Sequence, residues 1–422
     1  MTESPTKLLI KNIRELLCVV PDGETAPKLL QGAALHKMTV LEDAWLAVED
    51  GKISDFGSMY DLHGITDWSS LKVIDAEGKV VMPAWCDSHT HLVFAGSREG
   101  EFVDRIRGLS YEDIAAKGGG ILNSARKLQD TPEEVLFESA LARLNAVAQL
   151  GTGAIEIKSG YGLTPEAELK MLRVVRRLRE HSPVTIKATF LGAHAFPERF
   201  KSVPQAYVEQ IVHEMLPQVA EEGLAEYMDV FCERGYFSNN QTDQLLEASN
   251  QYGLRPKIHV NQFSISGGIE VAVRHNALSV DHLEVVGDAD IEALRGSGTM
   301  ATLLPSCSFF INIPYAPARQ LIDAGLPVAL ASDYNPGSTP SGNMPLVVAM
   351  GCIKLRMTPA EAIQAATLNG AYAMDLSDEL GSIAVGKKAN LIITQPIPSH
   401  EFLPYAFGSN LIEQVILNGQ LI

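Results

Sequence analysis

Cysteine, long apolar runs and basic residues are all scarce in this chain of 422 residues. Its five cysteines are scattered and nowhere arranged as C-x-x-C, which indicates neither a disulfide framework nor a zinc–thiolate site. No apolar run approaches the roughly 20 residues needed to cross a bilayer. The segment 1–10 lacks the basic start and apolar core of a signal peptide. We therefore expect a cytoplasmic protein.

Positive charge is in deficit, because 34 lysines and arginines face 51 aspartates and glutamates, giving a net charge of −17. This charge repels nucleic acid and anionic membranes, so neither is an expected partner. A small anionic substrate would need local cationic anchors. With 46% hydrophobic and 20% charged residues, the composition is typical of a globular protein.

The middle of the chain alternates apolar runs with amphipathic helices, which is the pattern of repeated βα units. Thr131 and Thr164 are each followed by a proline, so each is expected to cap a helix. The strand candidates are 81–91, 154–159, 185–194, 227–233, 257–262, 278–282, 299–305 and 328–333. Eight strands separated by helices predict an α/β protein with a (β/α)8 TIM-like barrel.

Both ends of the chain carry short β-rich runs instead, and neither end is long enough to build a core alone. The economical interpretation is a small β-sandwich domain formed by both chain ends. The predicted division is residues 1–75 plus 378–422 for this composite domain and residues 76–377 for the barrel.

Several strand candidates end in a residue that binds metals. His89 and His91 are two positions apart, so they point to the same side of a strand and can share one cation. His259, His282 and Asp333 end later strands, and a barrel gathers these ends at its active face. A lone strand-terminal histidine is more often structural, but several in succession make that alternative improbable. Imidazole and carboxylate ligands suit zinc or iron.

We expect one divalent metal ion held by His89, His91, His259 and Asp333. Such an ion brings the pKa of a bound water to about 7. Asp333 is positioned both to contact the ion and to take the proton of the water. His282 is expected to share the proton transfer and to polarise the carbonyl under attack.

These residues resemble the amidohydrolase superfamily. Its opening signature is similar to the segment from Asp75 to His91, and its closing signature to 381–391, with Ala84 and Asn390 departing from the usual glycine and aspartate. Within the superfamily, the chain is most similar to the branch that opens the ring of 4-imidazolone-5-propanoate to N-formimino-L-glutamate in histidine degradation. The markers are HLVFAGSRE at 91–99, KGGGI at 117–121, KSGYGL at 158–163, LGAH at 191–194 and SDYNPGS at 332–338.

The resemblance assigns seven residues to a substrate pocket. They are Arg98, Tyr161, His194, Gln262, Asn335, Gly337 and Ser338. It implies that Arg98 and Tyr161 hold the propionate, that His194 and Gln262 lie near the ring, and that the last three line the pocket floor. A planar guanidinium is well suited to a carboxylate. Without the family context, Arg98 would equally suit a surface ion pair and Tyr161 the packing of a loop.

Two further expectations depend on the same resemblance. Binuclear relatives bridge two ions with a modified lysine on the fourth strand, but segment 227–233 has no lysine and Lys158 lies on the second strand, so we expect a single ion. Related deaminases carry H-x-x-E where this chain has His259 to Gln262. An amide cannot relay a proton, which favours ring opening over deamination and gives Gln262 an orienting role.

Two alternatives remain open from the sequence. One is a different amidohydrolase, acting on a hydantoin-like or lactam ring or removing an amino group. The other is a non-enzymatic barrel that serves as a binding module. The resemblance also implies a homodimer.

Overall fold

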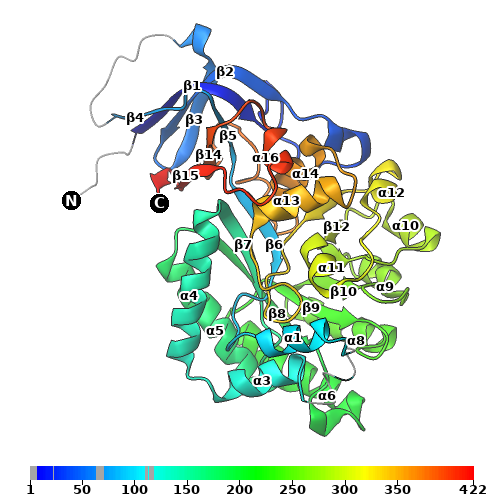
Figure 1. Ribbon diagram of the computed structural model, residues 1–422. Coiled ribbons are helices and arrows are strands. Elements are labelled where there is room, and N and C mark those ends of the chain that lie inside the picture. Colours follow the sequence, from blue (N-terminus) through cyan, green and yellow to red (C-terminus); the bar gives the residue numbers. More distant parts are fainter. Residues whose placement is uncertain (1–6, 22, 63–70, 110–112, 114–117) are drawn as a thin grey trace.

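The computed structural model describes residues 7–21, 23–62, 71–109, 113 and 118–422. It consists of a barrel of parallel strands surrounded by helices, and of a second sheet to which both ends of the chain contribute (Figure 1). In the described part of the chain, no helix is both long and apolar enough to cross a membrane.

Eight consecutive parallel strands form the barrel, as the sequence predicts. They are β6 (Trp85–Thr90), β7 (Thr152–Lys158), β8 (Thr185–Ala193), β9 (Tyr227–Cys232), β10 (Arg255–Val260), β11 (Ser279–His282), β12 (Met300–Leu303) and β13 (Val328–Leu330). The first strand meets the segment after the last one through two backbone hydrogen bonds. Asp333 N donates to His89 O at 3.0 Å, and His91 N donates to Tyr334 O at 2.9 Å. This contact brings two of the predicted metal ligands onto adjacent backbone.

The expectation of one strand over 81–91 is wrong, because the chain changes sheets at Ala84. The N–H of Ala84 donates to Asn390 O, in the second sheet, and the N–H of Trp85 donates to Gly151 O, next to barrel strand β7. The segment before Ala84 is β5 (Lys79–Pro83), which pairs with β14 (Leu391–Pro396). One apolar run therefore serves two sheets.

The second sheet joins the two ends of the chain, and red C-terminal strands lie beside blue N-terminal ones in Figure 1. Its further strands are β1 (Lys7–Leu17), β2 (Val40–Glu49), β3 (Lys52–Ser58), β4 (Leu71–Asp75), β15 (Ile412–Leu417) and β16 (Gln420–Leu421). Residues from both ends, among them Ile10, Leu46, Leu391 and Ile416, share one buried apolar cluster. A composite β domain is thus present. Its limits at 75 and 378 stay a prediction, and residues 1–6 and 63–70 of it lie outside the described residues.

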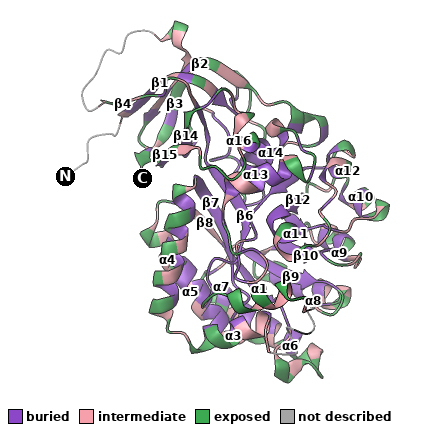
Figure 2. Ribbon diagram, in the orientation of Figure 1, coloured by how far each residue is buried: buried purple, intermediate pink, exposed green. Residues whose placement is uncertain are grey.

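Helices cover the outside of the barrel. They are α1 (Glu99–Ile106), α3 (Ile121–Asp130), α4 (Glu133–Gln149), α5 (Pro165–His181), α6 (Pro204–Gln210), α7 (Leu216–Glu221), α8 (Asn239–Gln251), α9 (Gly268–Arg274), α10 (Asp288–Leu294), α11 (Pro305–Ile311), α12 (Ala318–Asp323), α13 (Met344–Ile353), α14 (Pro359–Ala366), α15 (Leu368–Tyr372) and α16 (Phe402–Tyr405). In Figure 2 the barrel strands are almost wholly buried, and the helices turn their exposed sides outward.

The two predicted helix caps have different outcomes. Thr164 caps α5 as expected, since its hydroxyl accepts from Ala167 N at 3.3 Å. The prediction for Thr131 is wrong. Its hydroxyl donates to Lys127 O at 2.6 Å, at the end of α3, and Pro132 occupies the position before α4.

Candidate active site

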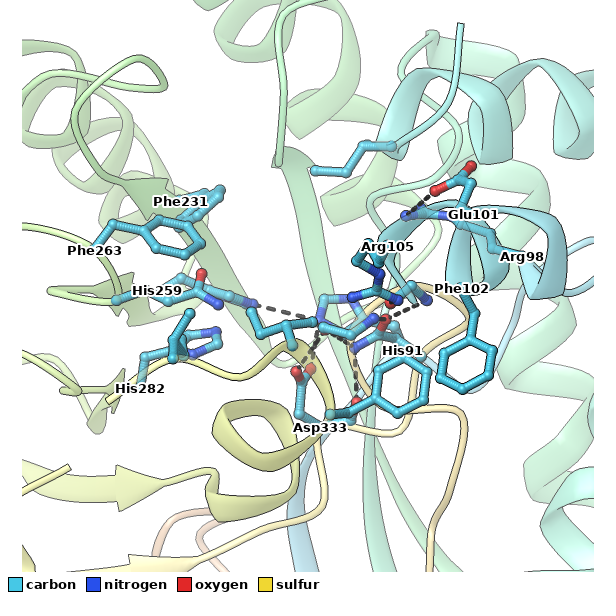
Figure 3. A pocket seen from close by; sticks show the side chains of 18 of the residues that line it. His91, Arg98, Glu101, Phe102, Arg105, Phe231, His259, Phe263, His282 and Asp333 are labelled. Atoms are coloured by element: carbon cyan, nitrogen blue, oxygen red, sulfur yellow. Dashed lines mark hydrogen bonds and ion pairs between the residues drawn. The ribbon is translucent and has the colours of Figure 1, made fainter. Parts of the chain in front are cut away.

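A cavity of about 500 Å³ opens at the carboxyl ends of the barrel strands (Figure 3). Its wall includes eleven of the twelve residues that the sequence assigns to a site. They are His91, Arg98, Tyr161, His194, Gln262, His259, His282, Asp333, Asn335, Gly337 and Ser338. The twelfth, His89, is fully buried, and its ring centroid lies 4.4 Å from that of His259. The fold therefore brings the whole predicted set together.

Four of these side chains converge on one point. His91 Nε2 lies 3.3 Å from His259 Nε2, and Asp333 Oδ1 lies 3.7 Å from both His89 Nε2 and His91 Nε2. Donor atoms about 2.0–2.1 Å from one tetrahedral ion are separated by about 3.3 Å. His89 Nε2 is buried and has no hydrogen-bond partner among the described residues. The spacing and this unpaired nitrogen fit a divalent cation.

The local electrostatics keep the imidazoles of His89 and His91 neutral. Burial, followed by the charge of Lys158, lowers the pKa of His89 well below its usual value. Burial, followed by the neighbouring His194, does the same for His91. The lone pairs needed for metal binding are therefore available at neutral pH.

Two carboxylates contact the Nδ1 atoms of His89 and His259. His89 Nδ1 lies 2.6 Å from Asp281 Oδ2, and His259 Nδ1 lies 2.9 Å from Asp229 Oδ2. A partner on Nδ1 fixes the orientation of the ring and directs the lone pair of Nε2 toward the ion. Neither aspartate was among the residues predicted from the sequence. The only signal was their place on barrel strands, since Asp281 directly precedes His282.

The backbone around Asp333 is held by Asp87, from the first barrel strand. Asp87 accepts hydrogen bonds from Ser332 N at 2.9 Å and from Ser332 Oγ at 2.5 Å. Asp333 adopts a left-handed conformation with φ 56°, and its Oδ2 accepts from Ser338 Oγ at 3.0 Å. These contacts hold the Asp333 carboxylate next to the Nε2 atoms of His89 and His91.

His282 lies beside His259 on the same side of the cavity (Figure 3), and the two ring centroids are 5.3 Å apart. Its Nδ1 lies 3.3 Å from Glu284 Oε1. Burial lowers the pKa of His282, but the charges of Glu284, Asp333 and Asp281 outweigh burial, and the net pKa is raised. His89, His259 and His282 also offer nitrogen atoms within 4.8 Å of one another. His282 is thus within reach of the ion and is able to carry a proton.

Arg98 lies across the cavity from His259 and His282, with His91 and Asp333 between them (Figure 3). Its Nε donates to Ser124 Oγ at 2.8 Å, and its guanidinium lies 5.6 Å from the centroid of the Tyr161 ring. Its Nη2 is buried with no hydrogen-bond partner in the described part of the chain. The neighbouring Nη1 lies 3.9 Å from Glu101 Oε2. Nη2 is therefore the atom of this guanidinium that is suited to an anionic ligand.

The remaining predicted residues shape the cavity. His194 Nδ1 donates to Gly160 O at 2.9 Å, and burial, followed by His259, lowers the pKa of His194 to about 3, so Nε2 is an acceptor. Gln262 Nε2 donates to Cys307 Sγ at 3.5 Å. Asn335 Oδ1 accepts from Gly337 N at 2.7 Å and from Ser338 N at 2.8 Å, which orders the floor.

Part of the cavity wall was not predicted from the sequence. Glu101, Phe102 and Arg105 line the cavity from α1, and Arg105 Nη2 donates to Gly337 O at 2.9 Å. Their signal was helical spacing, since Phe102 and Arg105 follow Arg98 by four and seven residues on one helix face. Of the glycine-rich marker at 117–121, Lys117 lies outside the described residues.

Comparisons with known proteins match most of the chain. The Amidohydrolase family matches residues 80–422. An imidazolonepropionase of Christiangramia forsetii is 59% identical over 415 residues, covering 98% of this chain and 100% of the relative. An imidazolonepropionase of Flavobacterium johnsoniae is also 59% identical, covering 98% of this chain and 99% of the relative.

Solved structures share the fold at low identity. The crystal structure of an adenosine deaminase from Xanthomonas campestris with bound zinc has a TM-score of 0.71 at 17% identity. The match covers 98% of this chain and 92% of that one. This likeness supports the barrel architecture.

Proposed function

Because this chain belongs to the amidohydrolase family, we propose that it hydrolyses 4-imidazolone-5-propanoate to N-formimino-L-glutamate, a step of histidine degradation. It is a hydrolase with imidazolonepropionase activity, in keeping with relatives 59% identical over nearly the whole chain. One observation of the site carries the choice of substrate. Nη2 of Arg98 is buried and has no hydrogen-bond partner among the described residues. Arg98 shares a single cavity with His91, His259 and Asp333, which together with His89 form what we call the His–Asp cluster, as a substrate with a carboxylate on a hydrolysable ring requires.

The divalent ion would be held by His89, His91, His259 and Asp333. We propose a single ion, either zinc or iron, since neutral imidazoles and a carboxylate suit both. When bound, such an ion lowers the pKa of a water molecule and polarises a carbonyl oxygen. Lys158, which we did not expect to bridge two ions, is engaged in ion pairs with Glu156 and Asp229.

Arg98 binds the propionate of the substrate, and Tyr161 lies beside its guanidinium. The neutral His194 presents Nε2 to the ring as an acceptor. Because His194 also stacks on His91 at a centroid distance of 5.2 Å, a bound ring lies close to the His–Asp cluster. Asn335, Gly337 and Ser338 form the floor beneath it.

Hydrolysis adds water to the ring carbonyl carbon and breaks the bond between that carbon and the ring nitrogen. Asp333 takes a proton from the attacking water, and the departing nitrogen receives a proton in return. His282, whose pKa is raised, is placed to hydrogen-bond the carbonyl oxygen and to share this transfer. Gln262 orients water or substrate, because an amide cannot take up and release a proton.

The assay that tests this function follows the loss of imidazolone absorbance after addition of 4-imidazolone-5-propanoate. Elemental analysis of the same sample measures zinc and iron per chain. We expect turnover, and about one ion per chain. Metal-replete protein that leaves this substrate intact but hydrolyses a hydantoin or a lactam would contradict the substrate assignment and retain the reaction class.

Three broader proposals accompany the activity. All five cysteines are free thiols, which suits a reducing cytoplasm. The family resemblance favours a homodimer, which light scattering coupled to size-exclusion chromatography would measure. We also retain the domain division at residues 1–75 plus 378–422 and 76–377, which limited proteolysis would test.

A further inference from the structure

Below the His–Asp cluster, the barrel holds a group of buried charges, of which only Asp229 and Asp281 contact the histidines of the proposed metal site. We call it the barrel-floor cluster, and its members are Glu156, Lys158, Asp229, Lys257 and Asp281, all with 0% relative exposure. Charges at this depth are costly unless they are paired. The contacts of each member therefore indicate what it stabilises.

Lys158 joins two carboxylates that come from different strands. Its Nζ lies 2.8 Å from Asp229 Oδ2, on β9, and 3.6 Å from Asp281 Oδ2, on β11. Strand β10 separates β9 from β11 in the barrel. A third carboxylate, Glu156, lies 2.5 Å from the same ammonium. One buried cation thus bridges two aspartates across an intervening strand.

Each of these aspartates holds one imidazole of the proposed metal site. Asp281 uses Oδ2 toward His89 Nδ1 at 2.6 Å, and Asp229 uses Oδ2 toward His259 Nδ1 at 2.9 Å. Asp229 also accepts from the backbone N–H of His259 at 3.0 Å through Oδ1. In both aspartates the oxygen that faces the histidine is the one that faces Lys158. A movement of the ammonium would therefore reach both rings.

We infer that Lys158 is a positioning residue of the metal centre, whose single ammonium fixes the two carboxylates that orient His89 and His259. This inference rests on the proposed metal site. Burial lowers the pKa of Lys158, but the carboxylates of Asp229, Glu156 and Asp281 together raise it above its usual value. The side chain therefore stays charged at neutral pH.

Lys257 offers a matched control at the same depth. Its ammonium is paired with Glu156 and donates to the backbone carbonyls of Ala373, at 3.0 Å, and Ser88, at 3.3 Å. Its charge also acts on the Asp281 carboxylate from a distance. Among the described residues, however, its ion pair is with Glu156 alone, so it does not bridge the two aspartates. Lys158→Met and Lys257→Met remove the same charge, and only the first removes the bridge between the two aspartates.

The test measures the zinc dissociation constant of metal-free protein by competition with a chromophoric chelator. Loss of a residue that orients metal ligands typically weakens metal binding 10–100-fold, so we expect a rise of about that size for Lys158→Met. We expect a clearly smaller rise for Lys257→Met. Thermal unfolding of each metal-free variant shows that it is folded. The inference is overturned if Lys158→Met binds zinc within about twofold of the wild type, or if Lys257→Met weakens binding equally.

A double-mutant cycle keeps the test independent of whether Lys158→Met folds. Asp229→Asn and Asp281→Asn are made singly and together, with Lys158 intact. Because both carboxylates share one ammonium, we expect their effects on the zinc dissociation constant to be non-additive by at least about threefold. Additive effects would contradict the inference that Lys158 links the two aspartates.

The outcomes also separate this inference from the proposed function. A wild-type protein that binds zinc but does not open the imidazolone ring would overturn the substrate and leave the role of Lys158 measurable. A wild-type protein that binds no divalent ion would overturn the metal site and the inference together.

Discussion

At the scale of single residues, Arg98 is held firmly by its neighbours while part of its guanidinium is left for a ligand. Ser124 fixes Nε, and Gly337 has no side chain at the point where a Cβ would overlap Nη1. If the proposed substrate binds here, its carboxylate meets a donor atom, Nη2, that has no hydrogen-bond partner among the described residues. No side chain has to be displaced.

The first prediction concerns the guanidinium of Arg98. Arg98→Met should raise KM about 10–100-fold, because a hydrogen bond to a charged group contributes about 1.5–3 kcal/mol. Metal content should not change, since Arg98 contacts none of the proposed ligands. Arg107→Met, at an exposed position after α1, is the matched control and should leave KM unchanged. Steady-state kinetics and elemental analysis measure both effects. Loss of metal from Arg98→Met would show that Arg98 belongs to the metal site.

At the scale of elements, β6, which carries His89 and leads directly to His91, is held from outside by α15. A Cβ at Gly370, in that helix, would overlap Cys86 O in β6. The helix therefore approaches the strand backbone more closely than any other residue type permits. A change at this contact would therefore affect both the stability of the folded protein and the position of His89.

The second prediction follows from this close approach. Gly370→Ala should destabilise the protein by about 1–3 kcal/mol, because β6 or α15 must shift to admit the methyl group. Gly100→Ala in α1 is the matched control, since a Cβ there meets no atom within 4 Å. The control should be neutral or stabilising by up to about 1 kcal/mol. Denaturant unfolding compares the two. Equal stability of both variants would contradict the packing of α15 on β6.

The start of helix α14 is stabilised by a buried carboxylate. Glu361 accepts from Arg319 Nη1 and Nη2 at 3.0 Å each and from Thr358 N at 2.7 Å, and its side chain is fully buried. Burial raises the pKa of Glu361, but the hydrogen bonds from Arg319 and Thr358 outweigh burial. The net pKa lies below its usual value of 4.5.

The third prediction is a pH dependence of stability that arises from Glu361. Because its pKa is lower in the folded protein than in the unfolded chain, its stabilisation is complete above pH 4.5 and is lost as the pH falls through the folded value. Glu361→Gln should therefore cost about 1–3 kcal/mol at pH 7 and progressively less below pH 4.5. Glu134→Gln, in an exposed pair with Arg177, should cost less than about 1 kcal/mol. A penalty for Glu361→Gln that does not shrink in acid would contradict this account.

At the scale of the whole molecule, the alternation of apolar runs with amphipathic helices was enough to predict the barrel. The β-rich runs at both ends of the chain were enough to predict the second sheet. Eleven of the twelve predicted site residues also line one cavity, because a barrel brings all its strand ends to one face. The change of sheets at Ala84 escaped prediction, since a continuous apolar run carries no sign of which sheet each half joins. The barrel-floor charges escaped for a related reason. Lys158 and Asp281 are far apart in sequence, and only the closed barrel makes them neighbours.

The proposed ion would connect distant parts of this molecule. Its four ligands lie in β6 and directly after it, in β10, and in the segment after β13, so it would join the first, fifth and eighth strands of the barrel. A ligand that binds only the folded state stabilises it by RT ln(1 + [L]/Kd), which is about 4 kcal/mol at a thousandfold excess over Kd.

The fourth prediction is that removing the ion with a chelator lowers the Tm by several degrees and abolishes ring opening. Returning zinc or iron to the dialysed protein should restore both. Asp333→Asn is the internal control, because it weakens the site while leaving the strands intact. The chelator should therefore shift its Tm much less. Differential scanning calorimetry with and without the ion measures the shift. An unchanged Tm in wild-type protein that elemental analysis shows to have lost its metal would mean that the four ligands do not hold the barrel strands together through the ion.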